Sequence, residues 1–193
     1  MATRAAQAEK TRQTVLDTAR KLFVEHGFDA TSLQQIADAM GVTKANVYYY
    51  FRTKIAILEA LLEPTVAALT ARLDDAERIT DREERIDHLI TTWVDQVVVA
   101  YRTIAPMSRH DPIARRHEKI ARELDELAQR GLHLMFGPAP TVDERAAYWL
   151  ISDLGVVNRR LDHLGDDELR ATLVRLCRGV VREAGRARST STR

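Results

Sequence analysis

Apolar residues recur along the chain at the three- and four-residue spacing of helices, and no segment alternates with the two-residue period of a strand. A first apolar stripe is closed by Gly27, and a capping box over residues 31–34 opens a second helix that ends near Gly41. Thr43 and Thr53 are predicted to cap the third and fourth helices. The first stripe consists of Leu16, Ala19, Leu22 and Phe23.

Longer helices follow the first three. Pro64 is expected to interrupt or kink the fourth. A capping box over residues 80–83 opens a helix to about residue 104, and Asp111-Pro112 starts another to about residue 136. A capping box over residues 141–144 opens a helix that ends near residue 165, and the last helix fades near residue 185. The pattern predicts an all-α fold of about nine helices.

Charge is distributed unevenly along the 193 residues, although the net charge is only +1. Residues 1–54 carry eight Lys and Arg against five Asp and Glu, whereas the remainder is slightly acidic. The N-terminal part is therefore the place to look for a nucleic-acid surface. The single cysteine, Cys177, falls in the apolar pattern of the last helix and indicates a small core residue in a reducing compartment.

The sequence lacks the motifs that mark several classes of protein. The chain has no apolar leader and no apolar run long enough for a membrane, so we expect a cytoplasmic protein without a membrane partner. GxGxxG, GxxxxGK[ST], GxSxG and HExxH are all missing, so we expect no enzyme, no catalytic residue and no cofactor. His110 and His117 lie about 10 Å apart on a helix, too far to share a metal ion, so no metal is expected.

Residues 33–51 fit a helix-turn-helix. Ile36 and Ala37 supply the inner face of the first helix, Gly41 falls at the turn, and Val47 and Tyr50 supply the inner face of the second. This unit is typical of proteins that insert the second helix into a DNA groove.

The helical wheel divides the run of aromatic residues at 47–51 between two faces. Val47 and Phe51 are four residues apart and point inward with Tyr50. Tyr48 and Tyr49 are expected to point outward, beside Lys44 and Ala45. Hydroxyl and ammonium groups on that outer face could contact phosphates and base edges. The alternative is that the tyrosines only pack against the fourth helix.

The N-terminal pattern resembles the DNA-binding domain of the TetR family of bacterial transcriptional regulators over residues 11–58. Three motifs carry the resemblance: A-x-x-L-F…G-F-x-x-T-S at residues 19–32, I-A…G-V-T at 36–43, and Y-x-Y-F-x-T-K at 48–54. By this resemblance, Thr31 or Ser32 touches a backbone phosphate, and Lys54 lies on another. The resemblance assigns the groove and its walls to Thr43, Lys44, Ala45, Asn46, Tyr48 and Tyr49.

Two positions depart from the family pattern. Ala45 stands where Gly is common, so its methyl group could favour contact with a thymine methyl. Ile55 stands where an acidic residue usually follows the lysine. It loses a favourable charge in the first turn of the fourth helix, and we expect it to pack instead.

The resemblance also implies the domain organisation. We expect a DNA-binding domain over residues 1–54 with its motif at about 32–51, an effector-binding and dimerisation domain over 55–185, and a disordered basic tail over 186–193. Each pocket candidate has an alternative role as a core or surface residue. The candidates for the pocket are Trp93, Tyr101, Met107, His110, His117, Met135, Phe136, Tyr148 and Asn158. The candidates for the dimer interface are Trp149, Leu150, Leu154, Val157, Leu169, Leu173, Leu176 and Val180.

The function that follows from the resemblance is that of a homodimeric repressor. Its partners would be a palindromic double-stranded DNA operator, a second copy of itself and a small hydrophobic or amphipathic effector that releases it from DNA. The alternative is a DNA-organising protein of the same fold that responds to no effector.

Overall fold

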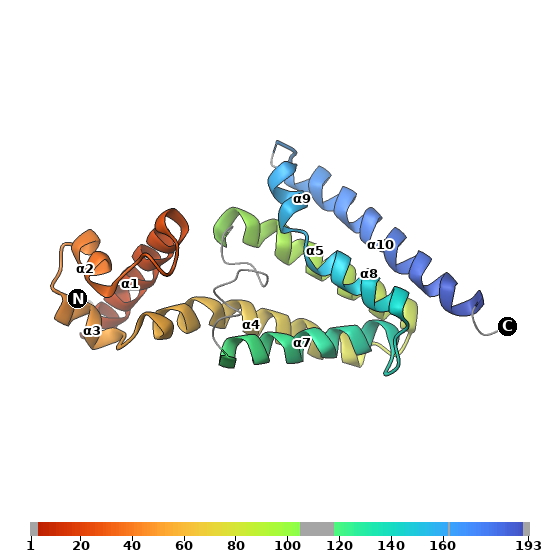
Figure 1. Cartoon of the computed structure of the whole chain (residues 1–193), viewed down its shortest axis with the longest axis horizontal. Coiled ribbons are helices and arrows are strands. Elements are labelled where there is room, and N and C mark those ends of the chain that lie inside the picture. Colours follow the sequence, from red (N-terminus) through yellow and green to blue (C-terminus); the bar gives the residue numbers. More distant parts are fainter. Residues whose placement is uncertain (1–3, 105–117, 162, 191–193) are drawn as a thin grey trace. The chain divides into compact units, whose positions relative to one another are not determined.

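The computed structural model describes residues 4–104, 118–161 and 163–190, and within these ranges every regular element is a helix, as predicted. The chain divides into two compact units, residues 1–67 and 68–193, which are described separately (Figure 1). None of the helices in the described ranges is long and apolar enough to cross a membrane. The helices are α1 (Arg4–His26), α2 (Leu33–Met40), α3 (Lys44–Tyr50), α4 (Lys54–Arg78), α5 (Arg82–Ile104), α7 (Glu118–Phe136), α8 (Val142–Ser152), α9 (Gly155–Arg160) and α10 (Asp166–Thr190).

Short-range hydrogen bonds define the ends of α2 and α3. The Ser32 side chain accepts from the backbone of Gln35 while the Gln35 side chain accepts from the backbone of Ser32, so the capping box begins one residue later than predicted. Gly41 ends α2 in the left-handed region with φ of 66°, which favours glycine. Thr43 and Thr53 cap α3 and α4 as predicted.

The N-terminal unit includes the first part of α4. Its core contains buried residues of α1, α2 and α3, and it continues through Ile57, Leu58 and Leu61. Pro64 lies inside α4 and does not interrupt it. The unit therefore ends at Ala67, within α4, whereas the sequence places the boundary at residue 54. Helix caps show where a helix begins, but they do not show how far along it the contacts of one domain extend.

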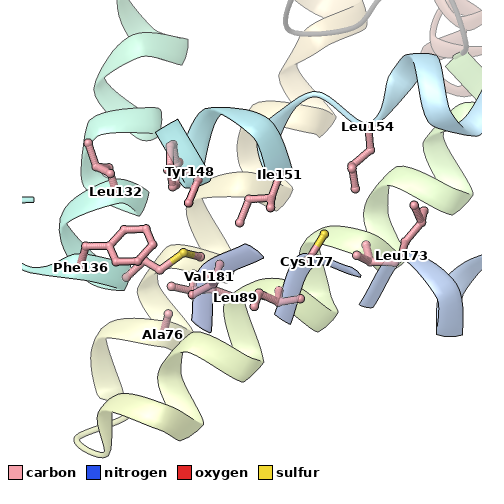
Figure 2. Close-up of a cluster of buried hydrophobic side chains, with 14 of the residues drawn as sticks. Ala76, Leu89, Leu132, Phe136, Tyr148, Ile151, Leu154, Leu173, Cys177 and Val181 are labelled. Carbon is pink, nitrogen blue, oxygen red and sulfur yellow. The ribbon is translucent and has the colours of Figure 1, made fainter. Parts of the chain in front are cut away.

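The core of the C-terminal unit lies among the second part of α4 and helices α5, α7, α8 and α10. Figure 2 shows Leu132 and Phe136 of α7 approaching Tyr148 of α8, with Cys177 of α10 in the same buried cluster. Burial raises the pKa of the Cys177 thiol to about 11, so this side chain is a neutral core residue at physiological pH.

Two ion pairs join α10 to α5. Asp87 accepts from Arg178 at 2.6 Å, and Asp95 accepts from Arg170. The pairs run in opposite order along the two helices, so α5 and α10 are antiparallel, and they lie side by side in Figure 1.

The structure corrects several predicted helix ends. Asp81, and not Thr80, caps α5, because its side chain accepts from the backbone of Glu84 at 2.8 Å. The predicted helix from residue 141 to 165 is divided into α8 and α9. Helix α10 continues to Thr190, so residues 186–190 of the predicted disordered tail are helical, since no breaker follows Gly185. The predicted start at 111–112 lies outside the described residues.

One local and one tertiary hydrogen bond lie at the break between α8 and α9. The Ser152 hydroxyl donates to the carbonyl of Tyr148 at 2.7 Å, a bond to the preceding turn that tends to bend helices. The indole N–H of Trp93 in α5 donates to the carbonyl of Ile151 at 2.8 Å. This carbonyl belongs to the last turn of α8 and would otherwise lack a donor.

Candidate nucleic-acid interface

Helix α3 buries one face and exposes the other, as the helical wheel predicts. Val47 is fully buried and Phe51 is nearly so, while Tyr48 and Tyr49 are 43% and 78% exposed. Tyr50 is half-buried, and its ring packs edge-on against that of Tyr49 with the centroids 5.1 Å apart. The buried side chains fix the helix on its own domain and leave the outer tyrosines accessible.

The first turn of α3 adds polar groups to the exposed face. Thr43, Lys44, Ala45 and Asn46 are all exposed. The Thr43 hydroxyl oxygen accepts from the backbone N–H of Asn46 at 3.3 Å, which leaves the hydroxyl proton available to an external acceptor. This face therefore offers a hydroxyl, an ammonium and an amide group to phosphates and base edges.

Arg52 extends the same surface, although the sequence analysis did not include it. Its guanidinium lies 5.3 Å from the centroid of the Tyr48 ring. The two residues are four positions apart, and this spacing could have revealed the pairing. Arg52 restricts the position of the Tyr48 ring and adds a positive charge beside the exposed face.

Thr31 has a role different from the predicted phosphate contact. It is buried, and its hydroxyl lies 2.8 Å from the carbonyl of Gly27, to which it donates. This bond holds the loop between α1 and α2. Ser32 is exposed, and its oxygen already accepts from the backbone of Gln35, so only its hydroxyl proton remains for a phosphate. Of the two alternatives, only Ser32 stays a candidate.

Lys54 is also drawn into the domain instead of pointing to the outside. Its ammonium donates to the carbonyls of Thr31 at 2.7 Å and Asp29 at 3.2 Å, and also to that of Phe28. The nitrogen lies 4.3 Å from the centroid of the Phe28 ring. Desolvation lowers the pKa of Lys54, and the nearby Asp29 partly opposes this shift. Because all three of its protons are used, we remove Lys54 from the predicted phosphate contacts.

Ile55 does not pack as predicted. The side chain is 39% exposed in the first turn of α4. Its position beside the helix N-terminus leaves it accessible to solvent, so the loss of an acidic residue there is not offset by full burial.

A small cavity in the C-terminal unit is lined by three of the predicted pocket residues. Trp93, Met135 and Tyr148 border a space of about 30 Å³ among α4, α5, α7, α8 and α10. A volume of this size is enough for a water molecule but not for a drug-sized ligand. Leu89, Tyr148, Ile151 and Cys177 of its lining belong to the buried cluster that Figure 2 shows.

Residues that the sequence analysis missed complete this cavity. Arg72 of α4 lies 5.0 Å from the centroid of the Trp93 ring and donates to Gln96 at 2.7 Å. Gly131 of α7 also borders the space. A Cβ at this position would lie only 2.5 Å from the Tyr148 hydroxyl oxygen, so α7 and α8 are closely packed here. These positions carry no local signal, since only packing across several helices brings them together.

The other pocket candidates are distributed differently. Phe136 is a core residue with 2% exposure. Asn158 of α9 is fully buried and donates from its amide nitrogen to the carbonyl of Val97 at 3.3 Å, away from the residues that border the cavity. The side chain of Tyr101 and the whole of Met107, His110 and His117 lie outside the described part of the chain.

The predicted interface residues fall into two groups. Trp149, Leu150 and Leu176 are 39%, 67% and 53% exposed on α8 and α10, and Val157 and Val180 are half-buried. By contrast, Leu154, Leu169 and Leu173 are buried in the core of this chain and are removed from the interface. The apolar stripe seen on the helical wheel is wide enough to include both core residues and surface residues. The sequence alone does not show which of its residues are buried.

The family model for the bacterial regulatory proteins of the tetR family matches residues 15–61, which span α1 to the first part of α4. Over these residues the chain carries the DNA-binding domain of the TetR family. The match contains the two-faced α3 and the glycine turn before it, so the family model and the geometry agree on a helix-turn-helix in this part of the chain.

Curated relatives match mainly over the N-terminal domain. The HTH-type transcriptional regulator SrpR of Pseudomonas putida is 45% identical over 58 residues, which cover 30% of this chain and 27% of SrpR. The HTH-type transcriptional regulator TtgR, also of Pseudomonas putida, is 30% identical over 83 residues, covering 43% and 38%. The match therefore spans well under half the length of each of these relatives.

Solved structures extend the similarity of fold to both units. The TetR-family regulator PfmR from Thermus thermophilus has a TM-score of 0.63 at 21% identity, covering 87% of this chain and 97% of that one. The regulator FadR from Bacillus subtilis, solved with stearoyl-CoA, has a TM-score of 0.59 at 17% identity, covering 89% and 96%. At these identities the similarity concerns the fold alone.

Proposed function

We propose that this chain is a DNA-binding transcriptional regulator of the TetR family, and that it acts as a homodimeric repressor. The observation that carries the proposal is the division of α3 into a buried face and an exposed face with polar groups and two tyrosines. Ser32, Thr43, Lys44, Ala45, Asn46, Tyr48 and Tyr49 are the proposed DNA contacts. A relative whose printed name is "Probable acrEF/envCD operon repressor", from Escherichia coli, supports repression.

The proposed contacts have separate tasks. Lys44 and the tyrosine hydroxyls position the helix on phosphates, while Asn46 and the Ala45 methyl group contact base edges. Arg52 holds the Tyr48 ring through their stacking contact. Phosphate contacts provide affinity that depends on salt, and base contacts provide the sequence preference.

Dimerisation is proposed to occur through the exposed apolar residues of α8 and α10. Trp149, Leu150 and Leu176 present apolar surface that a second copy would cover. Two recognition helices could then contact half-sites about 34 Å apart, one turn of DNA. A palindromic operator is the DNA sequence that matches this two-fold symmetry.

An effector is proposed to bind at the cavity beside Trp93 and Tyr148 and to release the dimer from DNA. Its lining is mostly apolar, which favours a small hydrophobic or amphipathic compound. Since the cavity holds only about 30 Å³, binding requires the helices around it to move apart. The effector shifts the equilibrium toward this expanded state by its higher affinity for it.

Selection of duplexes from a random library, followed by fluorescence anisotropy, tests DNA binding. We expect a palindromic site, and we expect Lys44→Ala to reduce the slope of log affinity against log salt by about one. Lys119→Ala is the matched control, because Lys119 is exposed on α7 in the other unit. An unchanged slope for Lys44→Ala would refute the proposed contact.

Genome-wide binding then separates regulation from DNA organisation. A few palindromic sites at promoters support the repressor, whereas hundreds of scattered sites would indicate the DNA-organising alternative. Loss of transcription from those promoters when the chain is expressed supports repression, and increased transcription would indicate activation.

A further inference from the structure

A second hollow opens on the surface of the C-terminal unit, next to the cavity beside Trp93, with which it shares Ile90. It lies where the first turns of α5 meet the second part of α10, which run side by side in Figure 1. Its volume is about 760 Å³, within the range of small-molecule sites. Its apolar floor is formed by Ile86, Ile90 and Val181. We refer to this hollow as the α5–α10 groove.

Arginines dominate the rim of the α5–α10 groove. Arg178, Arg182 and Arg186 follow one another at four-residue spacing along α10, so they share one side of the helix, and Arg82 joins them from the first turn of α5. Like charges at this spacing destabilise a helix, and a bound anion would remove that repulsion.

The carboxylates of the groove leave part of this positive charge unbalanced. Asp87 is engaged by Arg178 at 2.6 Å. Glu144 is fully buried, and its side chain accepts from the backbone N–H of Thr141 at 2.8 Å in the α8 capping box. Glu83 is the remaining carboxylate of the lining.

Two of the rim arginines have no partner of their own. Within the described residues, Arg82 and Arg182 make no hydrogen bond or ion pair with another side chain. Arg186 lies 3.4 Å from Glu183, an exposed pair on one helix that solvent screens. The groove therefore offers two unengaged guanidinium groups above an apolar floor.

The groove faces away from the proposed dimer surface. Arg178 and Arg182 each follow an apolar interface candidate, Leu176 or Val180, by two residues, which is about 200° around an α-helix. A second copy covering those apolar residues would leave the groove open.

We propose that the α5–α10 groove binds an organic anion with an apolar body, as a second site next to the effector cavity, with which it shares Ile90. Arg82 and Arg182 hold its carboxylate or phosphate group, since guanidinium forms paired hydrogen bonds with both. The apolar body lies over Ile86, Ile90 and Val181. The charge of the rim and the apolar floor each exclude ligands that lack the matching part.

Calorimetric titration of the full chain with decanoate, decyl phosphate and uncharged decanol tests the site. Arg82→Gln and Arg182→Gln are each expected to weaken binding of both anions by about tenfold, as expected for loss of one charge-assisted hydrogen bond. Arg175→Gln is the matched control, because Arg175 is exposed on the same helix but does not line the groove. Whichever anion binds more tightly identifies the preferred head group.

A steric variant locates the site independently of charge. A Cβ added at Gly185 would meet nothing within 4 Å, so α10 should accommodate Gly185→Leu without a clash. Because Gly185 lines the groove, the leucine side chain should occupy part of it. The variant should abolish binding of both anions. Binding as in the wild type by Gly185→Leu or by the Arg82→Gln/Arg182→Gln double variant, equal affinity for decanol, or no binding of either anion would each overturn the proposal.

Discussion

Lys54 shows how one residue can have a different role from its matched position in a family motif. The motif places a lysine at the start of the fourth helix, where a phosphate contact is plausible. In the structure its ammonium is surrounded by three carbonyls of the segment between α1 and α2. Lys54 therefore joins the start of α4 to that segment and supports the surface that α3 presents.

Lys54→Met is expected to lower the free energy of unfolding by roughly 2 kcal/mol, because three carbonyls lose a charged donor. Chemical denaturation measures the loss. Lys44→Met is the matched control, and it should change stability by no more than about 0.5 kcal/mol because Lys44 is exposed.

DNA binding by the same variants separates the two lysines further. Where Lys54→Met is still folded, it should keep the salt slope of the wild type. A slope reduced by about one, with stability unchanged, would restore Lys54 to the phosphate contacts.

At the scale of elements, close packing between α7 and α8 depends on one glycine. The Tyr148 hydroxyl of α8 occupies the space that a side chain at Gly131 of α7 would need. The same two residues also border the cavity beside Trp93. The proposed effector would have to change this packing.

Gly131→Ala is expected to destabilise the protein by about 1–3 kcal/mol, since the new Cβ would lie 2.5 Å from the Tyr148 hydroxyl oxygen. Tyr148→Phe removes that oxygen, and the double variant should recover most of the loss in a thermal-unfolding double-mutant cycle.

A glycine in open space provides the control for this cycle. Gly185→Ala adds the same methyl group where nothing lies within 4 Å, so it should leave stability equal or slightly raised. If Tyr148→Phe and Gly131→Ala were simply additive, the close contact would not be the cause.

At the scale of the whole molecule, α8 and α10 carry apolar side chains that remain exposed after the core of this chain is packed. Leu150 and Leu176 are 67% and 53% exposed, although each lies on a helix that also buries a full apolar face. Leu173, by contrast, belongs to the core, so a charge there would unfold the unit instead of separating two copies.

Leu150→Glu combined with Leu176→Glu is expected to give a folded monomer, because facing carboxylates would replace apolar contacts across the two-fold axis. Sedimentation velocity measures the change, and affinity for a palindromic duplex should fall with it. Ile55→Glu is the control, since Ile55 is exposed in the N-terminal unit. A double variant that still sediments as a dimer would place the interface elsewhere.

What the sequence by itself determined was local. The caps at Thr43 and Thr53, the glycine turn at Gly41 and the two faces of α3 depend on residues within a few positions of one another, and the structure confirms each. The similarity to the TetR family rests on the N-terminal residues 15–61, which contain these positions.

Only the tertiary structure decided the features that need distant partners. The structure shows that the Lys54 ammonium donates to three carbonyls and that α8 ends before α9 begins, where Trp93 donates to Ile151. It also shows which leucines among the interface candidates are buried in the core and which are exposed. The physical reason is that the wheel of one helix shows which residues share a face. Whether that face meets another helix or solvent depends on residues far away in the chain.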